Sequence, residues 1–317
     1  MQSEASSATC PICSAHARYD SSSRDLMFDH YDRYDYFKCT DCGSIFLHPM
    51  PDLETIGSFY PAHYTVFDCE SPIRTVSPLK QAILRCKHGY THLAPPLPYR
   101  LLAALLSPFY RLATPDYIAN STLLDVGCGN GRYLSTMRAL GWKVQGVELS
   151  ENGFKVCQAS RLDVHHGDLA SATFPDASFE LITVRHVIEH IPDPRAFMAE
   201  LARILKPGGR LVIETPNSSA LGRSFMGANW YANDVPRHLV LFSPENLGRL
   251  AASFGLRQSQ VWLETTPKII LNSIDYALHN TGKASNKVGW KRLLARLYLW
   301  LARYSKRGDT IHSVFSK

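Results

Sequence analysis

The chain has 317 residues, which is more than one average domain and predicts one large domain with an appendage. Apolar residues make up 45% of it and charged residues 20%, a balance that excludes a disordered or fibrous chain. No run approaches the ~18 apolar residues of a membrane span, and the N-terminus lacks the basic and apolar regions of a secretory signal. We therefore expect a cytoplasmic protein.

The first 50 residues hold four cysteines in two C-x-x-C pairs, Cys10 with Cys13 and Cys39 with Cys42. Two thiolate pairs on separate turns suit a tetrahedral zinc ion, which would supply folding free energy to a segment with little apolar core. Because four thiolates leave no open coordination position, we expect the zinc to be structural. A redox pair is the alternative. The segment 1–50 is therefore predicted to be a zinc-ribbon module.

Residues 51–120 have helical segments broken by prolines, which predicts a helical lid or linker. From residue 121 onward strands alternate with helices of about ten residues, which predicts an α/β fold with a parallel, doubly wound, Rossmann-like sheet over 121–317. The expected strands are 122–126, 143–147, 179–184 and 210–214, and the expected helices are 132–140, 151–161 and 195–205. Ser243 and Pro244 should begin a further helix, and 267–308 should form a helical insertion before a final strand at the sheet edge.

The strand at 122–126 leads into a glycine-rich turn with Gly127, Gly129 and Gly131. The absence of side chains in such a turn lets the backbone approach a ligand closely. The spacing differs from the dinucleotide fingerprint G-x-G-x-x-G, because Arg132 stands where the third glycine belongs. Glu148 follows at the end of the next strand, where it could bind both hydroxyls of a ribose. These features predict an adenosine pocket, and a tight turn with a surface acid is the alternative.

Four motifs in order make residues 121–215 resemble the class I S-adenosylmethionine (SAM)-dependent methyltransferases. They are LLDVGCGNGRYL, VQGVELS, the Gly167-Asp168-Leu169 run and LKPGGRLVIETPN. The resemblance implies that Gly127 and Gly129 line the methionine part of SAM, that Glu148 holds the ribose, and that Asp168 reaches the adenine amino group. The wider set implied for the cofactor adds Tyr64 in a lid segment, Asp125, Cys128, Leu149, Leu169 and Arg185. The cysteine-rich segment is similar to the N-terminal ribbon of many bacterial methyltransferases of polysaccharide and natural-product pathways.

The candidate catalytic residues follow two later strands: His186, Glu189 and His190 after one, and His238 after the other. Since ligands bind beyond the carboxyl ends of strands in an open α/β sheet, we expect the first group to border the transferred methyl group. Imidazole is the usual general base near neutral pH. A similar Glu-x-x-Glu-His run in ubiquinone-pathway and small-RNA 2′-O-methyltransferases is associated with a divalent metal, whereas His186 here replaces the first Glu. His238 could be a second base or complete a metal shell, and packing is the alternative role.

Much of the net charge of +6 lies at the C-terminus, where residues 281–317 hold nine Lys/Arg and one acid. One stripe of a helix expected there is apolar: Trp290, Leu293, Leu294, Leu297, Tyr298, Leu301 and Tyr304. We expect this stripe to pack on the sheet or on a second subunit. The alternative is peripheral contact of 290–307 with an anionic membrane surface, on its inner, cytoplasmic face.

The sequence thus predicts an enzyme that transfers a methyl group from SAM to a small-molecule acceptor. A sugar or another hydroxylated metabolite, free or linked to a nucleotide or lipid, is the expected acceptor. One alternative is an RNA 2′-O-methyltransferase-like enzyme that uses the histidine/glutamate cluster, with the ribbon and basic tail on nucleic acid. The other is a non-catalytic SAM-binding protein. Dimerisation is left open.

Overall fold

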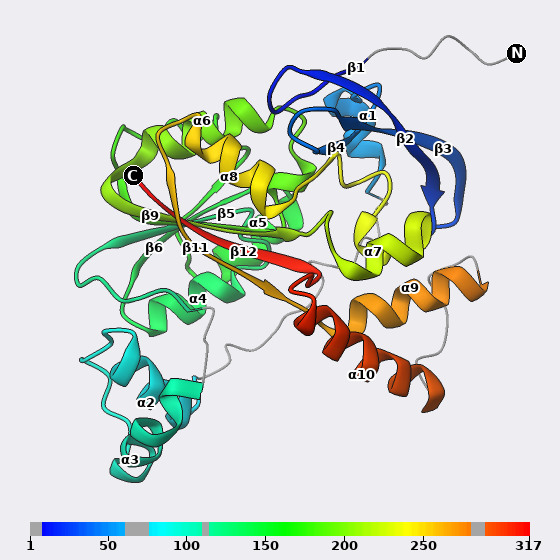
Figure 1. Cartoon of the computed structure of the whole chain (residues 1–317). Helices are drawn as coiled ribbons and strands as arrows, with labels where there is room; N and C mark the ends of the chain where they lie inside the picture. The colour runs from blue at the N-terminus through cyan, green and yellow to red at the C-terminus, as the bar shows by residue number, and fades with distance from the viewer. Residues whose placement is uncertain (1–7, 61–75, 110–113, 280–288) are drawn as a thin grey trace, which may run out of the picture. The chain divides into compact units, whose positions relative to one another are not determined.

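A computed structural model describes residues 8–60, 76–109, 114–279 and 289–317 (Figure 1). The chain divides into two compact units. One consists of residues 1–63, 184–203 and 210–317, and the other of residues 64–183 and 204–209. Each unit is therefore assembled from segments that are distant in the sequence.

Seven strands form a mixed sheet in the order β11-β12-β9-β8-β5-β6-β7 (Figure 1). Strands β5 to β7 pair in parallel, whereas β12 runs antiparallel to both β9 and β11. The strand bounds are β5 Thr122–Val126, β6 Lys143–Glu148, β7 Val164–His166, β8 Phe179–Arg185, β9 Leu205–Pro216, β11 Arg257–Glu264 and β12 Thr310–Ser316. This sheet confirms the predicted α/β class with Rossmann-like order.

The helices that alternate with these strands are α4 Arg132–Ala139, α5 Glu151–Ala159, α6 Pro194–Ile204 and α8 Pro244–Ala252. Helix α8 begins where the sequence predicts. The Ser243 hydroxyl accepts from Asn246 N at 3.3 Å, and the Asn246 side chain accepts from Ser243 N at 2.9 Å. This reciprocal pair satisfies two backbone donors that the first helical turn leaves free.

Two expectations about the strands were wrong. Residues 206–209, which the sequence leaves between the expected helix 195–205 and the expected strand 210–214, belong to β9 instead, and Lys206 there forms an ion pair with Glu180 of the neighbouring β8. The last strand, β12, is also not at the sheet edge, since β11 lies outside it. The sequence of β11 is mostly exposed and lacks the apolar alternation that predicts a strand.

The cysteine-rich segment forms a five-stranded antiparallel sheet in the unit that contains the C-terminus. Its strands are β1 Ala8–Thr9, β2 His16–Asp25, β3 His30–Cys39, β4 Ile45–Leu47 and β10 Val240–Leu241. Strand β10 pairs with β4 through Val240 opposite Phe46. The ribbon sheet therefore includes a strand that comes about 200 residues later in the chain.

Six further α-helices occur among the described residues. α1 Leu53–Ser58, α2 Pro78–Lys87 and α3 Leu97–Leu106 follow the ribbon, α7 Leu221–Met226 follows β9, and α9 Pro267–His279 and α10 Gly289–Tyr304 precede β12. Short 3-10 turns are η2 Ser107–Phe109, η3 Ile188–His190, η4 Gly227–Asn229 and η5 Tyr231–Asn233. Helices α9 and α10 pack against each other (Figure 1). None of the described helices is long and apolar enough to cross a membrane.

Candidate functional site

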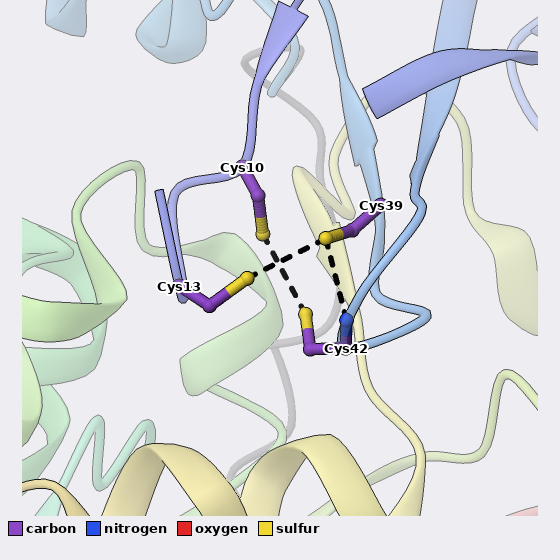
Figure 2. A group of neighbouring side chains, drawn as sticks. All are labelled: Cys10, Cys13, Cys39 and Cys42. Carbon is purple, nitrogen blue, oxygen red and sulfur yellow. Dashed lines mark hydrogen bonds between the residues drawn. The ribbon is translucent and has the colours of Figure 1, made fainter. Parts of the chain in front are cut away.

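The four ribbon thiols point toward one another (Figure 2). The Sγ atoms of Cys10 and Cys42 lie 3.6 Å apart, those of Cys13 and Cys39 lie 3.4 Å apart, and all four Sγ atoms are within 4.8 Å of one another. A tetrahedral zinc with Zn–S bonds of about 2.3 Å would separate its sulfurs by about 3.8 Å. The backbone N–H of Cys42 also donates to the Cys39 sulfur, at 3.4 Å. The donor set and its spacing fit one zinc ion with no open position.

The predicted cofactor turn lies in the other unit, where it bonds directly to the predicted ribose-binding acid. The Glu148 carboxylate accepts from Gly129 N at 2.6 Å and from Ser150 N at 2.8 Å. Gly127, Gly129 and Gly131 all have left-handed backbones, and a Cβ on Gly131 would lie 2.3 Å from a Leu162 methyl. Burial raises the pKa of Glu148, and the Ser150 and Gly129 N–H groups oppose that rise. The turn and the acid therefore form one structural group.

The other residues that are predicted to bind the cofactor differ in how exposed they are. Asp125 is buried at the end of β5 and accepts from the Thr183 hydroxyl at 2.6 Å, while Cys128 is buried within the turn. Leu149 is 73% exposed, so it leaves an apolar surface open beside Glu148. Asp168 is exposed, and hydrogen bonds from Ser171 lower its pKa.

The structure says less about three further residues that are predicted to bind the cofactor. Leu169 is buried, and Arg185 ends β8. Tyr64 lies outside the described residues. Their assignments to the cofactor stay predictions.

The predicted catalytic residues gather in the unit that contains the ribbon, around the fully buried Glu189 of η3. The Thr215 hydroxyl donates to Glu189 Oε2 at 2.8 Å, and His186 Nδ1 lies 3.3 Å from Glu189 Oε1. The other ring nitrogen of His186 lies 3.2 Å from Glu214 Oε1. Because a carboxylate only accepts hydrogen bonds, both nitrogens must carry protons, so His186 is an imidazolium. Burial lowers its pKa, but the two carboxylates outweigh burial and raise the pKa of His186 to about 10.

His186 also has an unusual backbone. Its φ is +53°, a left-handed value that is uncommon for a residue other than glycine. Its N–H donates to Glu214 O at 2.8 Å, which holds the strained turn in place immediately after β8. The side chain is 50% exposed, so a ligand can reach it from solvent. Burial would raise the pKa of Glu189, but His186 lowers it to about 2, so the two are a stable ion pair.

In both His190 and His238, the ring nitrogen Nδ1 lies against a backbone carbonyl oxygen. His190 Nδ1 lies 2.9 Å from Arg237 O, and His238 Nδ1 lies 2.9 Å from Ala232 O, so each Nδ1 donates its proton to a carbonyl. In the neutral ring Nε2 then carries the lone pair. Burial and the nearby His190 lower the pKa of His238 to about 4. Each of Glu189, His190 and His238 offers a ligand atom within 4.8 Å of the others.

Arg237 was missed by the sequence reasoning, although it adjoins His238. Its side chain is fully buried and bonds to two carboxylates: Nη1 to Asp25 at 2.7 Å and Nη2 to Asp234 at 2.7 Å. Its guanidinium also lies over the Phe28 ring, 5.0 Å from the centroid. The backbone carbonyl of Arg237 accepts a hydrogen bond from His190 Nδ1. The ion-pair cluster around Arg237 therefore links His190, a catalytic candidate, to the ribbon hairpin. The only sequence signal was its place beside a candidate histidine.

Comparisons with known proteins identify the family. Residues 93–261 match a methyltransferase domain family. The chain is 31% identical over 160 residues to the ubiquinone biosynthesis O-methyltransferase of Thiobacillus denitrificans, which covers 45% of this chain and 68% of that protein. The ubiquinone biosynthesis O-methyltransferase of Aromatoleum aromaticum is 28% identical over 157 residues, 45% of this chain and 67% of that protein.

A solved structure of a SAM-dependent methyltransferase from Archaeoglobus fulgidus is similar over 69% of this chain and 94% of its own, at 22% identity and a TM-score of 0.47. The cysteine ribbon precedes the matched region, which begins at residue 93. The matched region contains the glycine turn and Glu148. The chain therefore belongs to the class I SAM-dependent methyltransferases.

Proposed function

We propose that this methyltransferase transfers the SAM methyl group to a hydroxyl oxygen of a small molecule. A hydroxyl must lose its proton to become an effective nucleophile, so O-methylation needs a base. The observation that carries the proposal is the orientation of His190. Its Nδ1–H donates a hydrogen bond to Arg237 O, which leaves Nε2 free to accept a proton. The names of the relatives, ubiquinone biosynthesis O-methyltransferases, support the same reaction.

In the proposed reaction His190 Nε2 takes the proton of the acceptor hydroxyl. The oxygen forms a bond to the SAM methyl carbon while the bond between that carbon and sulfur breaks. The electron pair of the broken bond stays on sulfur, which gives S-adenosylhomocysteine. Glu189 lies close enough to stabilise the imidazolium that His190 becomes. We assign the binding of SAM to Gly127, Gly129, Glu148 and Asp168.

We assign His186 an electrostatic role. Its positive charge offsets Glu189 and Glu214, so that the cluster does not repel an acceptor oxygen that is losing its proton. Its exposed edge can also contact the acceptor. Because its pKa is raised to about 10, His186 is not itself the base at neutral pH.

For the acceptor we favour a phenolic hydroxyl over a sugar hydroxyl. Phenols have pKa values near 10, as tyrosine does, so a phenol gives up its proton to a histidine base far more readily than an alcohol does. A sugar, free or linked to a nucleotide or lipid, is the second acceptor class. An RNA acceptor would instead show binding that falls steeply with salt.

A divalent cation is a second candidate for the same cluster. Glu189, His190 and His238 supply one carboxylate and two imidazoles, and each histidine donates its other ring proton to a carbonyl, as metal-bound histidines commonly do. Such an ion would lower the pKa of an acceptor hydroxyl. Turnover that is lost with EDTA and restored by Mg²⁺ or Mn²⁺ would favour the ion over the histidine base.

We also propose that Cys10, Cys13, Cys39 and Cys42 hold a structural zinc. Their Sγ spacing and the N–H donor to Cys39 support this assignment. The ion would supply folding free energy to the ribbon and take no part in methyl transfer.

Methyl transfer from radiolabelled SAM to a panel of phenols and sugars tests the proposed reaction. We expect label on a phenolic oxygen, and we expect His190→Gln to lower kcat roughly 10²- to 10⁴-fold while SAM affinity stays unchanged. The matched control is His16→Gln, an exposed histidine of the ribbon, which should keep full turnover. Full turnover in His190→Gln, or label found on nitrogen or carbon, would refute the proposal.

A further inference from the structure

Helix α10 presents three distinct strips of side chains along its length. One strip is buried and consists of Lys291, Ala295, Tyr298 and Ala302. The second is apolar and exposed, with Leu293, Leu297, Trp300 and Tyr304 each more than half exposed and Trp290, Leu294 and Leu301 beside them. The third is basic and exposed, with Arg292, Arg296 and Arg303. The apolar strip that the sequence predicts to be packed away, Tyr298 excepted, therefore faces solvent.

The buried strip holds the helix firmly against its own unit. Lys291 forms an ion pair with Asp275 of α9, and the Tyr298 hydroxyl donates to Asp309, which immediately precedes β12. Tyr298 also packs edge-to-face against Trp230, and its oxygen accepts from Gly222 N at 3.2 Å. Since α10 is anchored through this side, its leucine and tryptophan strip cannot turn inward.

The charge on α10 is of one sign. Residues 289–304 contain no acid, and Arg292, Arg296 and Arg303 are exposed. Lys291 is neutralised by Asp275, so it does not add to the free charge, whereas Arg307 keeps its charge while it donates to the neutral Ser219 carbonyl at 2.9 Å. Lys306, just after the helix, is exposed and also adds to the free charge. An apolar strip beside three arginines is complementary to an anionic, partly apolar surface.

We propose that the exposed side of α10 docks on the surface of an anionic membrane. Leucines and tryptophans would enter the boundary between headgroups and acyl chains, and the arginines would contact lipid phosphates. A second copy of the chain is a poorer occupant, because α10 offers no acid to pair with the arginines of its partner. The helix follows the matched domain, residues 93–261, so the proposal concerns a feature outside that domain.

The proposal extends to a neighbouring side chain. Phe225 of α7 is exposed, and its ring lies 6.2 Å from that of Tyr298 on the buried strip of α10. Large exposed apolar patches on a protein surface mark interaction sites. Docking of this helix lies along the surface, since none of the described helices could span the bilayer.

Sedimentation of the full-length protein with vesicles tests the proposal. We expect binding to phosphatidylglycerol/phosphatidylcholine vesicles and little binding to pure phosphatidylcholine, with affinity falling as salt rises. At about 1 kcal/mol for each basic residue, the triple variant Arg292→Gln/Arg296→Gln/Arg303→Gln should lower the partition coefficient roughly 100-fold. The variant Leu293→Gln/Leu297→Gln/Trp300→Gln should also lose binding, with SAM affinity unchanged in both.

The matched control is Leu97→Gln/Leu101→Gln/Leu105→Gln on α3, which removes three equally exposed leucines from the other unit. This variant should bind vesicles as the unmodified protein does. Loss of binding in the α3 variant alone, equal binding to neutral vesicles, or no vesicle binding would overturn the proposal. A dimer in sedimentation velocity that the Leu293/Leu297/Trp300 variant abolishes would assign the strip to self-association and overturn it too.

Discussion

Arg237 Nη1 lies 2.7 Å from Asp25 Oδ2, and both side chains are buried although 212 residues separate them in the chain. Asp25 ends β2, the first strand of the β2–β3 hairpin of the ribbon, and Arg237 immediately precedes His238. The backbone carbonyl of the same arginine accepts a hydrogen bond from His190 Nδ1. The ribbon is therefore structurally linked to the histidine cluster through one buried ion pair, which gives a reason for the two to occur in one compact unit.

The first prediction is that Arg237→Met destabilises the protein severely. The change leaves the carboxylates of Asp25 and Asp234 buried without their cation, and breaking a buried pair in this way costs about 3–5 kcal/mol of unfolding free energy. Urea denaturation followed by circular dichroism measures the loss.

The chain offers a matched control for this prediction. Arg249 pairs with Asp41 of the ribbon at 2.8 Å, but both side chains are about half exposed. Solvent weakens such a pair, so Arg249→Met should leave the unfolding free energy nearly unchanged. Equal losses in the two variants would show that the burial of Arg237 is not what matters.

The second prediction concerns cofactor affinity. Glu148→Gln removes the charge that accepts from Gly129 N and Ser150 N, and hydrogen bonds to charged groups contribute about 1.5–3 kcal/mol. We expect S-adenosylhomocysteine to bind roughly 10- to 100-fold more weakly in calorimetry. Glu151→Gln, an exposed residue that pairs with Lys155, should bind as the unmodified protein does. Unchanged affinity in Glu148→Gln would remove that residue from the cofactor site.

The structural group of the glycine turn and Glu148 could be predicted from the sequence because it is local. The strand, the glycine turn, the helix and Glu148 lie within about 30 residues, and each has its own pattern: an apolar run, glycines and a helix period. The bond from Gly129 N to Glu148 follows from the parallel pairing of β5 with β6. No tertiary contact beyond neighbouring strands is needed.

The histidine cluster could be predicted only in part, because its decisive contacts are distant in the sequence. His186 was expected to be a base, but its second carboxylate, Glu214, lies inside a strand whose pattern reveals only burial. The Arg237–Asp25 pair likewise has no periodic signal. Tyr298 was grouped with the leucines of α10 because a stripe of seven residues is wider than one helical face, and it belongs to the buried strip.

The third prediction is that the purified protein contains about one zinc per chain and that the metal is structural. Cys10→Ser should release the zinc and lower the thermal midpoint, because metal binding supplies folding free energy to the ribbon. Atomic absorption and calorimetry measure the two effects. Cys86→Ser is the control, since that cysteine is exposed and outside the cluster. Full zinc content in Cys10→Ser would show that the ion is bound elsewhere.

The fourth prediction is a pH dependence of stability that comes from Asp309. Burial raises its pKa to about 7, although the Tyr298 hydroxyl donates to its carboxylate and opposes the rise. The folded state therefore holds this proton more tightly than the unfolded state does. The contribution to stability is complete below pH ~4, the ordinary pKa of an aspartate, and is lost as the pH rises through about 7.

Asp309→Asn removes this titration while keeping an oxygen that can accept from Tyr298. Between pH 4 and 7 the unfolding free energy of the unmodified protein should therefore fall relative to that of the variant, by up to about 1.4 kcal/mol per pH unit. Urea denaturation across this range measures the difference, and Asp163→Asn, an exposed aspartate bonded to Gln145, should show none. If Asp309→Asn keeps the slope of the unmodified protein, the buried carboxyl does not titrate in this window, and the link between α10 and β12 is independent of pH.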